Sequence, residues 1–136
     1  MKQGKLLDSF AVIAYLSKES GYEKVREALA HAQSTGGKVL MNDVNVGEVY
    51  YILARKRGFE SAEYFIATIL PSLPIRTIPN TLEDVVSAAK IKAQYPLSYA
   101  DCFAVDTARR HSAGILTGDP EFKKVGHLVE ICWINK

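Results

Sequence analysis

Short apolar runs alternate along this chain with longer stretches in which apolar residues recur every three or four positions. The short runs, each bounded by turn or capping residues, predict strands; they cover residues 5–7, 38–41, 75–78, 114–117 and 130–133. The longer stretches predict helices; they cover residues 10–17, 22–34, 45–56, 61–70, 82–94, 99–111 and 120–125. Because parallel strands need long crossovers, this alternation predicts an α/β fold, with helices on both faces of a parallel sheet.

Length and composition favour one globular domain over residues 1–136. The 136 residues are 48% apolar and 24% charged, and no repeat or linker divides them. A chain of this size buries enough surface to fold without a metal or a disulfide, so a bound metal would serve function. The net charge of +2 is too small to indicate nucleic-acid binding by itself.

The first residues resemble a secretory signal, because Lys2 and Lys5 precede an apolar run. Asp8 interrupts that run, and no stretch reaches the ~20 apolar residues of a membrane span, so we expect a cytoplasmic protein. Cys102 and Cys132 form no C-x-x-C pair and are expected to be free thiols. The three histidines show no metal-ligand spacing and are expected at the surface or at helix ends.

Four carboxylates lie among apolar neighbours: Asp8, Glu48, Asp101 and Asp119. Asp8 and Asp119 closely follow strands, so they are expected at the carboxyl edge of the sheet, where α/β domains bind ligands. Glu48 and Asp101 lie near the starts of largely apolar helices and are expected to point inward. Each acid also has a local interpretation as a capping residue: Asp8 and Asp119 as N-caps, and Glu48 and Asp101 in capping boxes with Asn45 and Ser98.

Buried carboxylates require a compensating cation, and these four segments contain no lysine or arginine. A bound divalent ion would provide the charge, and oxygen ligands favour Mg²⁺ or Mn²⁺. The hydroxyls of Thr117 and Ser9 could assist, although both residues also suit an ordinary structural role. Asp43 is expected to cap the third helix, and Asp106 to form a solvated ion pair with Arg110.

The order of these motifs resembles PIN-domain proteins, close to the VapC-type ribonuclease toxins of toxin–antitoxin pairs. The resemblance rests on LLDSF, on GEVYYILARKRG, on LSYADCFAVDTARRHSAGILTGDPEFKKV and on a final strand, and it covers nearly the whole chain. It implies a five-stranded parallel sheet of order 3-2-1-4-5. In that order, the strands preceding Asp8 and Asp119 are neighbours.

The resemblance also implies an activity, which is magnesium- or manganese-dependent hydrolysis of RNA phosphodiesters by a metal-activated water. Asp8 and Asp101 are the expected direct ligands, while Glu48 and Asp119 orient waters or hold a second ion, and Thr117 assists. The products would carry 5′-phosphate and 3′-hydroxyl groups. The family further implies a homodimer and a small antitoxin whose C-terminal segment covers the active-site groove.

RNA affinity must come from basic residues around an acidic pocket. The candidates end two helices: Arg55, Lys56 and Arg57 after Glu48, and Arg109 and Arg110 after Asp101, with Lys123 and Lys124 following Asp119. Cations also favour helix C-termini for local reasons, through the helix dipole. Tyr15, Tyr50, Tyr51 and Tyr99 could stack on bases, but we expect core packing.

Two alternatives remain. One is a receiver-type signalling module that binds Mg²⁺ at a strand-end aspartate, which leaves Glu48 and Asp101 unexplained. The other is a PIN-fold RNA-processing nuclease without an antitoxin. A surface for an antitoxin or a second copy could include apolar residues of the second and fourth helices, although most must be core: Val25, Leu29, Phe65, Ile66 and Leu70.

Overall fold

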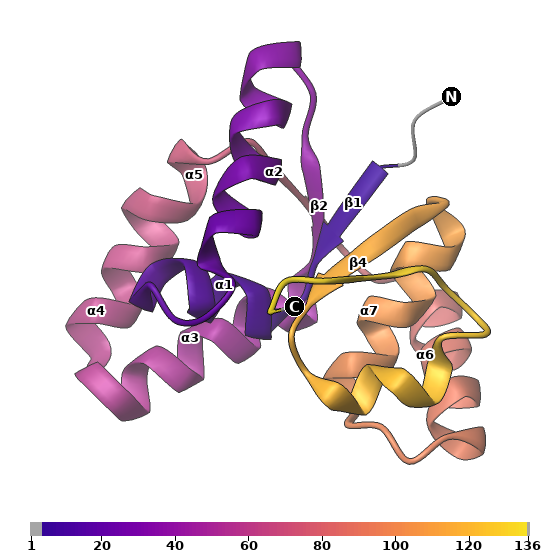
Figure 1. The fold of residues 1–136 in the computed structure, drawn as a ribbon. Coiled ribbons are helices and arrows are strands. Elements are labelled where there is room, and N and C mark those ends of the chain that lie inside the picture. Colours follow the sequence, from indigo (N-terminus) through magenta and orange to yellow (C-terminus); the bar gives the residue numbers. More distant parts are fainter. Residues whose placement is uncertain (1–3, 136) are drawn as a thin grey trace.

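The computed structural model describes residues 4–135, which form one α/β domain (Figure 1). The strands are β1 (Gly4–Leu7), β2 (Val39–Asn42), β3 (Ile75–Ile78), β4 (Ala113–Thr117) and β5 (Ile131–Trp133). The α-helices are α1 (Ser9–Ser17), α2 (Tyr22–Thr35), α3 (Asp43–Arg57), α4 (Phe59–Tyr64), α5 (Leu70–Ser72), α6 (Leu82–Gln94) and α7 (Tyr99–Arg110). A π-helical turn, η1 (Phe65–Ile69), joins α4 to α5, and a 3₁₀ helix, η2 (Pro120–Val125), follows β4.

All five strands are parallel, and their order is β3-β2-β1-β4-β5, which confirms the predicted sheet. Leu7 pairs with Leu116 on one side of β1, and Leu6 pairs with Leu40 on the other. This register places the residue after β1, Asp8, level with Thr117 at the end of β4 and with Asn42 at the end of β2. Three polar side chains therefore share one level of the carboxyl edge.

Helices cover both faces of the sheet, as the alternation of elements predicted (Figure 1). Successive side chains of a strand point to opposite faces, so Leu7 packs with α1, α2 and α3 while Leu6 packs with α6 and α7. The described part of the chain thus has an apolar core on each face. Val25, Leu29 and Phe65 belong to the first core and do not form a surface for a partner.

The segment predicted as one helix over residues 61–70 begins earlier and is less regular. Gly58, with φ +94°, ends α3 and precedes α4. Within the helical segment, the N–H of Leu70 donates to the carbonyl of Phe65, a five-residue step. Pro71 follows directly and has no N–H to donate, which removes one ordinary helical hydrogen bond there.

The start of α3 also differs from the prediction. Asn42, and not Asp43, is the N-cap, since its side chain accepts a hydrogen bond from the N–H of Val44. Asn45 therefore lies inside the helix, and the predicted capping box with Glu48 is wrong. Asp8 caps α1 and Asp119 caps η2, as predicted. Ser98 caps α7 with its side chain, but Asp101 does not accept a hydrogen bond from the N–H of Ser98, so only half of that predicted capping box is present.

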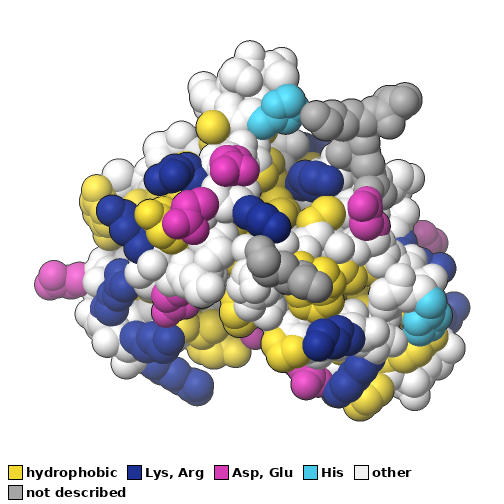
Figure 2. Space-filling view, viewed as in Figure 1, with side chains coloured by type: hydrophobic (Ala, Val, Ile, Leu, Met, Phe, Trp, Pro, Cys, Tyr) yellow, Lys and Arg dark blue, Asp and Glu magenta, His cyan; other side chains and the backbone are white. Residues whose placement is uncertain are grey.

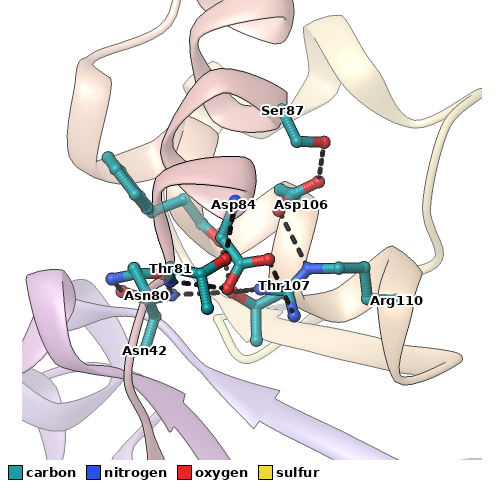
Figure 3. A network of polar contacts seen from close by, with 9 residues as sticks. Asn42, Asn80, Thr81, Asp84, Ser87, Asp106, Thr107 and Arg110 are labelled. Carbon is teal, nitrogen blue, oxygen red and sulfur yellow. Dashed lines mark hydrogen bonds and ion pairs between the residues drawn. The ribbon is translucent and has the colours of Figure 1, made fainter.

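Asn42 is also the centre of a buried polar network that ties β2 to α7 (Figure 3). Its amide N–H groups donate to Asn80 at 2.7 Å and to Thr107 at 2.8 Å. One residue before Thr107 on α7, Asp106 accepts a hydrogen bond from Ser87 and pairs with Arg110, and Arg110 also pairs with Asp84. The predicted ion pair of Asp106 is thus present, but the residue is only 6% exposed, because α6 covers this side of α7. The prediction that the pair is solvated was wrong.

Both cysteines are free. Cys102 is buried in the core around α7, and Cys132 is partly buried in β5.

Candidate active site

Asp8 and Thr117 meet at the carboxyl edge because β1 and β4 are neighbours in register. The hydroxyl of Thr117 donates to Asp8 Oδ2 at 2.5 Å, and the backbone N–H of Ala11 donates to Oδ1 at 2.9 Å. Asp8 is 1% exposed and Thr117 is fully buried. The aspartate thus caps α1 with one oxygen and faces the neighbouring strand with the other.

Thr117 connects Asp8 to the second strand-end acid. Its Oγ1 accepts a hydrogen bond from the backbone N–H of Asp119 at 3.0 Å, and Asp119 Oδ1 accepts from the N–H of Glu121 at 2.9 Å. The hydroxyl therefore orients both the Asp8 carboxylate and the turn that carries Asp119. These contacts fit both the functional and the structural interpretation of Thr117, and they coexist with the capping role of Asp119.

Glu48 reaches the same region from α3. It lies one and a half turns into that helix, and Ser9 at the start of α1 donates its hydroxyl to Glu48 Oε1 at 2.5 Å. Ser9 immediately follows Asp8, so the first turn of α1 holds one acid by its side chain and carries another. The sequence suggested Ser9 only as a residue that could assist, and its contact with Glu48 gives it a definite place.

Asp101 lies in the first turn of α7, whose start is fixed by Ser98: its hydroxyl accepts from the N–H of Asp101 at 3.2 Å. Asp101 is 7% exposed, as expected from its apolar neighbours along the helix. Its negative charge interacts with those of Asp119 and Glu48. The four acids predicted to gather thus come from the starts of α1, α3, α7 and η2.

A cavity of about 480 Å³ opens between these elements, a volume typical of a small-ligand site. Glu48, Asp101 and Asp119 line it, while Asp8 is buried next to it and interacts with Asp101 and Asp119. Sequence reasoning missed several other lining residues: Phe10, Ile13, Glu19, Ile52 and Glu121. Glu19 and Glu121 have polar neighbours in sequence, so they do not share the apolar surroundings that indicated the other acids.

Burial and mutual repulsion disfavour ionisation of the two least exposed acids. Burial, opposed by the hydrogen bonds from Thr117 and Ala11 and reinforced by Asp101 and Asp119, raises the pKa of Asp8 to about 8. Burial and the neighbouring charge of Asp119 raise the pKa of Asp101 to about 7. A cation placed among the acids would reverse this effect, because it favours the ionised forms.

No lysine or arginine of the described residues forms an ion pair with any of these four acids. Between residues 4 and 135, no three acidic, histidine or cysteine side chains converge into a ready cage for a metal ion. Mg²⁺ does not need such a cage, since it keeps several waters and binds through one or two carboxylates. The donor set therefore suits a hydrated hard cation that is held by few direct ligands.

The predicted basic residues are spread over different surroundings. Lys56 lines the acidic cavity, Arg57 donates to Ser17 on α1, and Arg55 lies 5.1 Å from the ring of Tyr51. Figure 2 shows Lys and Arg side chains gathered at the lower left of one face, over the end of α3 and the start of α4.

Arg109 and Arg110 end α7, about 13 Å along the helix axis from Asp101. Arg110 is already paired with Asp84 and Asp106. The two arginines therefore lie away from the acids, while Lys56 lies beside them.

Two of the four tyrosines expected in the core are exposed. Tyr51 is 46% exposed and Tyr99 is 45% exposed, whereas Tyr15 and Tyr50 are partly buried against the first core. Tyr51 lies next to Glu48, its hydroxyl 3.5 Å from Oε2, and Tyr99 packs edge-on against Phe103. Both lie on helix faces that the rest of the fold leaves uncovered, which the local sequence could not indicate.

Within the described residues, no helix has the length and apolar character needed to span a membrane. The chain has no match among curated proteins. Its fold is similar to several solved structures at low sequence identity, and three of them show the extent of the likeness.

DNA-bound VapBC from Salmonella typhimurium has a TM-score of 0.73 and 13% identity, over 97% of this chain and 98% of that chain. VapC20 from Mycobacterium tuberculosis, described as a toxin that cleaves the sarcin-ricin loop, has a TM-score of 0.68 and 17% identity, covering 90% and 95%. PAE2754 from Pyrobaculum aerophilum has a TM-score of 0.63 and 14% identity, covering 98% and 92%.

The sheet order excludes the receiver-type alternative, because receiver modules place their strands in the order 2-1-3-4-5. The model of the PIN domain matches residues 5–128, which include all four acids and every strand but the last. On this match, the chain belongs to the PIN domain family.

Proposed function

We propose that this protein is a divalent-metal-dependent endoribonuclease and the toxin of a VapBC-type toxin–antitoxin pair. The observation that carries the proposal is that Glu48, Asp101 and Asp119 line one cavity and Asp8 is buried beside it, with no basic side chain of residues 4–135 paired to these acids. Such a site binds a hard cation and, through it, the phosphate of a nucleic acid.

Asp8 and Asp101 would hold Mg²⁺ or Mn²⁺ directly, with Glu48 and Asp119 orienting its waters or holding a second ion. When bound, the cation supplies positive charge to the phosphate oxygens and lowers the pKa of a bound water. Burial raises the pKa of both Asp8 and Asp101, which supports choosing them as ligands. A cation offsets the cost of ionising buried carboxylates.

The protein's own residues would orient the reaction. Thr117 holds Asp8 and the turn of Asp119, and Ser9 holds Glu48, so the acids keep fixed directions when the substrate arrives. In the reaction, the oxygen of one water bonds to phosphorus, the bond from phosphorus to the 3′ oxygen breaks, and a proton passes to that oxygen. The products are a 5′-phosphate and a 3′-hydroxyl.

The acidic cavity repels a polyanion, so the RNA backbone requires cations at the rim. Lys56 is the first choice because it lines the cavity, and the neighbouring Arg55 and Arg57 extend the basic surface along the end of α3. Arg109 and Arg110 would contact only RNA that extends to the far end of α7.

The toxin assignment draws support from the similar fold of a structure described as a toxin–antitoxin complex from Klebsiella pneumoniae, and from the similar fold of VapBC from Salmonella typhimurium. A small antitoxin would then cover the acidic cavity, and the toxin itself would be a homodimer. The alternative, an RNA-processing nuclease without an antitoxin, uses the same chemistry.

The test of the enzyme is to incubate purified protein with total cellular RNA, with Mg²⁺ or with EDTA, and to map new 5′ ends. We expect discrete 5′-phosphate ends that require Mg²⁺ and disappear in the D101N variant. RNA left intact under both conditions would contradict the proposal.

A second experiment separates the toxin from a processing nuclease. Expression alone should arrest growth, and coexpression with a cognate small antitoxin should restore it and yield a complex that co-purifies. Normal growth during expression of active enzyme would favour the processing role.

A further inference from the structure

Asn45 is a fully buried amide between the two acid-bearing helices, and sequence analysis gave it no functional role. It lies on α3, three residues before Glu48 and therefore on the same side of that helix. Its Nδ2 donates to the backbone carbonyl of Ala100 at 3.1 Å, and Ala100 immediately precedes Asp101 on α7. One side chain thus connects α3 to the turn that carries Asp101.

The other end of the same amide has no partner. Asn45 Oδ1 is buried, and no donor among the described residues reaches it. Exchanging the positions of Oδ1 and Nδ2 does not give Oδ1 a donor. Oδ1 would then face the carbonyl of Ala100, and two acceptors cannot form a hydrogen bond with each other. A buried acceptor without a donor destabilises a fold, so stability alone does not favour asparagine at this position.

Asn42 provides the contrast, because it is an equally buried asparagine at the start of the same helix. Its Oδ1 accepts from Val44 and Asn80, and its Nδ2 donates to Asn80 and Thr107. That amide satisfies both of its ends and has a clear structural purpose. In Asn45, only Nδ2 has a hydrogen-bond partner, and that partner is the carbonyl of Ala100 in the first turn of α7.

We infer that Asn45 is a positioning residue of the acidic site: its N–H group holds the first turn of α7 against α3 and thereby fixes the spacing of Glu48 and Asp101. The inference rests on the proposed function for its catalytic meaning, and on the hydrogen bond to Ala100 for its mechanism. Asn45 does not line the acidic cavity, so it acts through the turn that it holds. Its free Oδ1 is the structural cost of placing a donor at this position.

The test compares Asn45→Leu and Asn45→Ala with Asn42→Leu. Replacing Asn45 removes an unpaired acceptor, so thermal unfolding of the metal-free protein should occur at an equal or higher temperature. Asn42→Leu should lower the unfolding temperature, because it removes the side-chain partners of Asn80 and of the N–H of Val44. Hydrogen exchange of the metal-free Asn45 variants should accelerate at the start of α7, at the amides of Asp101 and Cys102, and not elsewhere.

Function is then measured on the same Asn45 variants. We expect Mn²⁺ affinity, measured by calorimetry, to fall about tenfold, the scale of losing a residue that orients a metal ligand. RNA cleavage should fall in kcat with little change in KM, because substrate contacts remain.

Each outcome decides the inference. Unchanged exchange at the start of α7, a lower unfolding temperature, or failure of both Asn45 variants to fold would make Asn45 an ordinary core residue and overturn it. Local exchange that accelerates while Mn²⁺ affinity and kcat stay at wild-type values overturns it too. If the unsubstituted protein binds no Mn²⁺ and cleaves no RNA, the proposed function fails, and the exchange result still decides whether Asn45 holds α7.

Discussion

Replacing Asp8 with asparagine should stabilise the metal-free protein at neutral pH, although it should abolish activity. The carboxyl has a pKa of about 8 in the folded protein and 3.8 in the unfolded chain, so the folded state binds its proton more tightly. Stability from this group is therefore complete below about pH 4 and is lost as the pH rises to about 8. The substituted side chain keeps a carbonyl oxygen for the N–H of Ala11 and places an amide beside the Thr117 hydroxyl, without the buried charge.

The magnitude follows from the same pKa difference. Applied between low pH and pH 7, the linkage relation gives a loss of ~4 kcal/mol from the values of about 8 and 3.8. Relaxation around the charge reduces this figure, and we expect the D8N protein to gain about 2–4 kcal/mol at pH 7 in EDTA. Asp101, with a pKa raised to about 7, weakens the wild-type protein in the same pH range.

Urea denaturation in EDTA at pH 5 and pH 7 measures how the free energy of unfolding changes with pH in the wild-type and D8N proteins. Wild-type stability should fall between these pH values, and the D8N protein should fall less. Asp106→Asn is the matched control, because this buried aspartate is paired with Arg110 and bonded to Ser87, and its loss should cost about 1–3 kcal/mol. Adding Mg²⁺ should stabilise the wild type and not the D8N protein. A D8N protein less stable than the wild type in EDTA at pH 7 would refute the reasoning.

Asp101→Asn should reduce Mg²⁺-dependent cleavage by about 10²-fold or more while circular dichroism remains unchanged. Full activity of this variant would show that Asp101 does not take part in catalysis. Ser9→Ala frees Glu48 and should lower kcat about tenfold with KM nearly constant, as steady-state kinetics can measure. Lys56→Glu should weaken binding of all RNAs similarly and flatten the dependence on salt in a filter-binding assay; a loss confined to one sequence would contradict this role. Arg110→Ala, by contrast, should lower the unfolding temperature with little effect on RNA affinity, since its ion pairs lie at the far end of α7.

Hydrophobic periodicity predicted the helices and strands of this fold well, because the local pattern of most segments agrees with the element that they form. The strand over residues 75–78 was predicted with the bounds that the structure gives, β2 is shifted by one residue, and the other three strands differ by one residue at one end. Helix starts were predicted where one capping residue has no competitor, as at Ser98. At α3 two candidates, Asn42 and Asp43, are adjacent, and the sheet register decided between them by placing Asn42 at the strand end.

The gathering of the acids could be predicted, but their individual environments could not. Parallel strands end at one edge, so Asp8 and Asp119 had to be neighbours once β1 and β4 were adjacent. The burial of Asp106 depends on how α6 packs on α7, and the exposure of Tyr51 and Tyr99 depends on which helix faces remain uncovered. Those are tertiary relations between segments with no sequence signal of their own.

Thr117 shows how local sequence and tertiary packing together determine the contacts of a site residue. A threonine two residues before an aspartate is an ordinary strand ending, and the sequence allowed no decision between structure and function. The register of β1 with β4 decides its contacts, because it places one hydroxyl between the Asp8 carboxylate and the backbone N–H of Asp119. The same hydroxyl that completes the local structure therefore sets the direction of an acid in the site. Structural and functional interpretations of such residues are not exclusive, and an acid's hydrogen-bond partners show which of its oxygens remain available to a ligand.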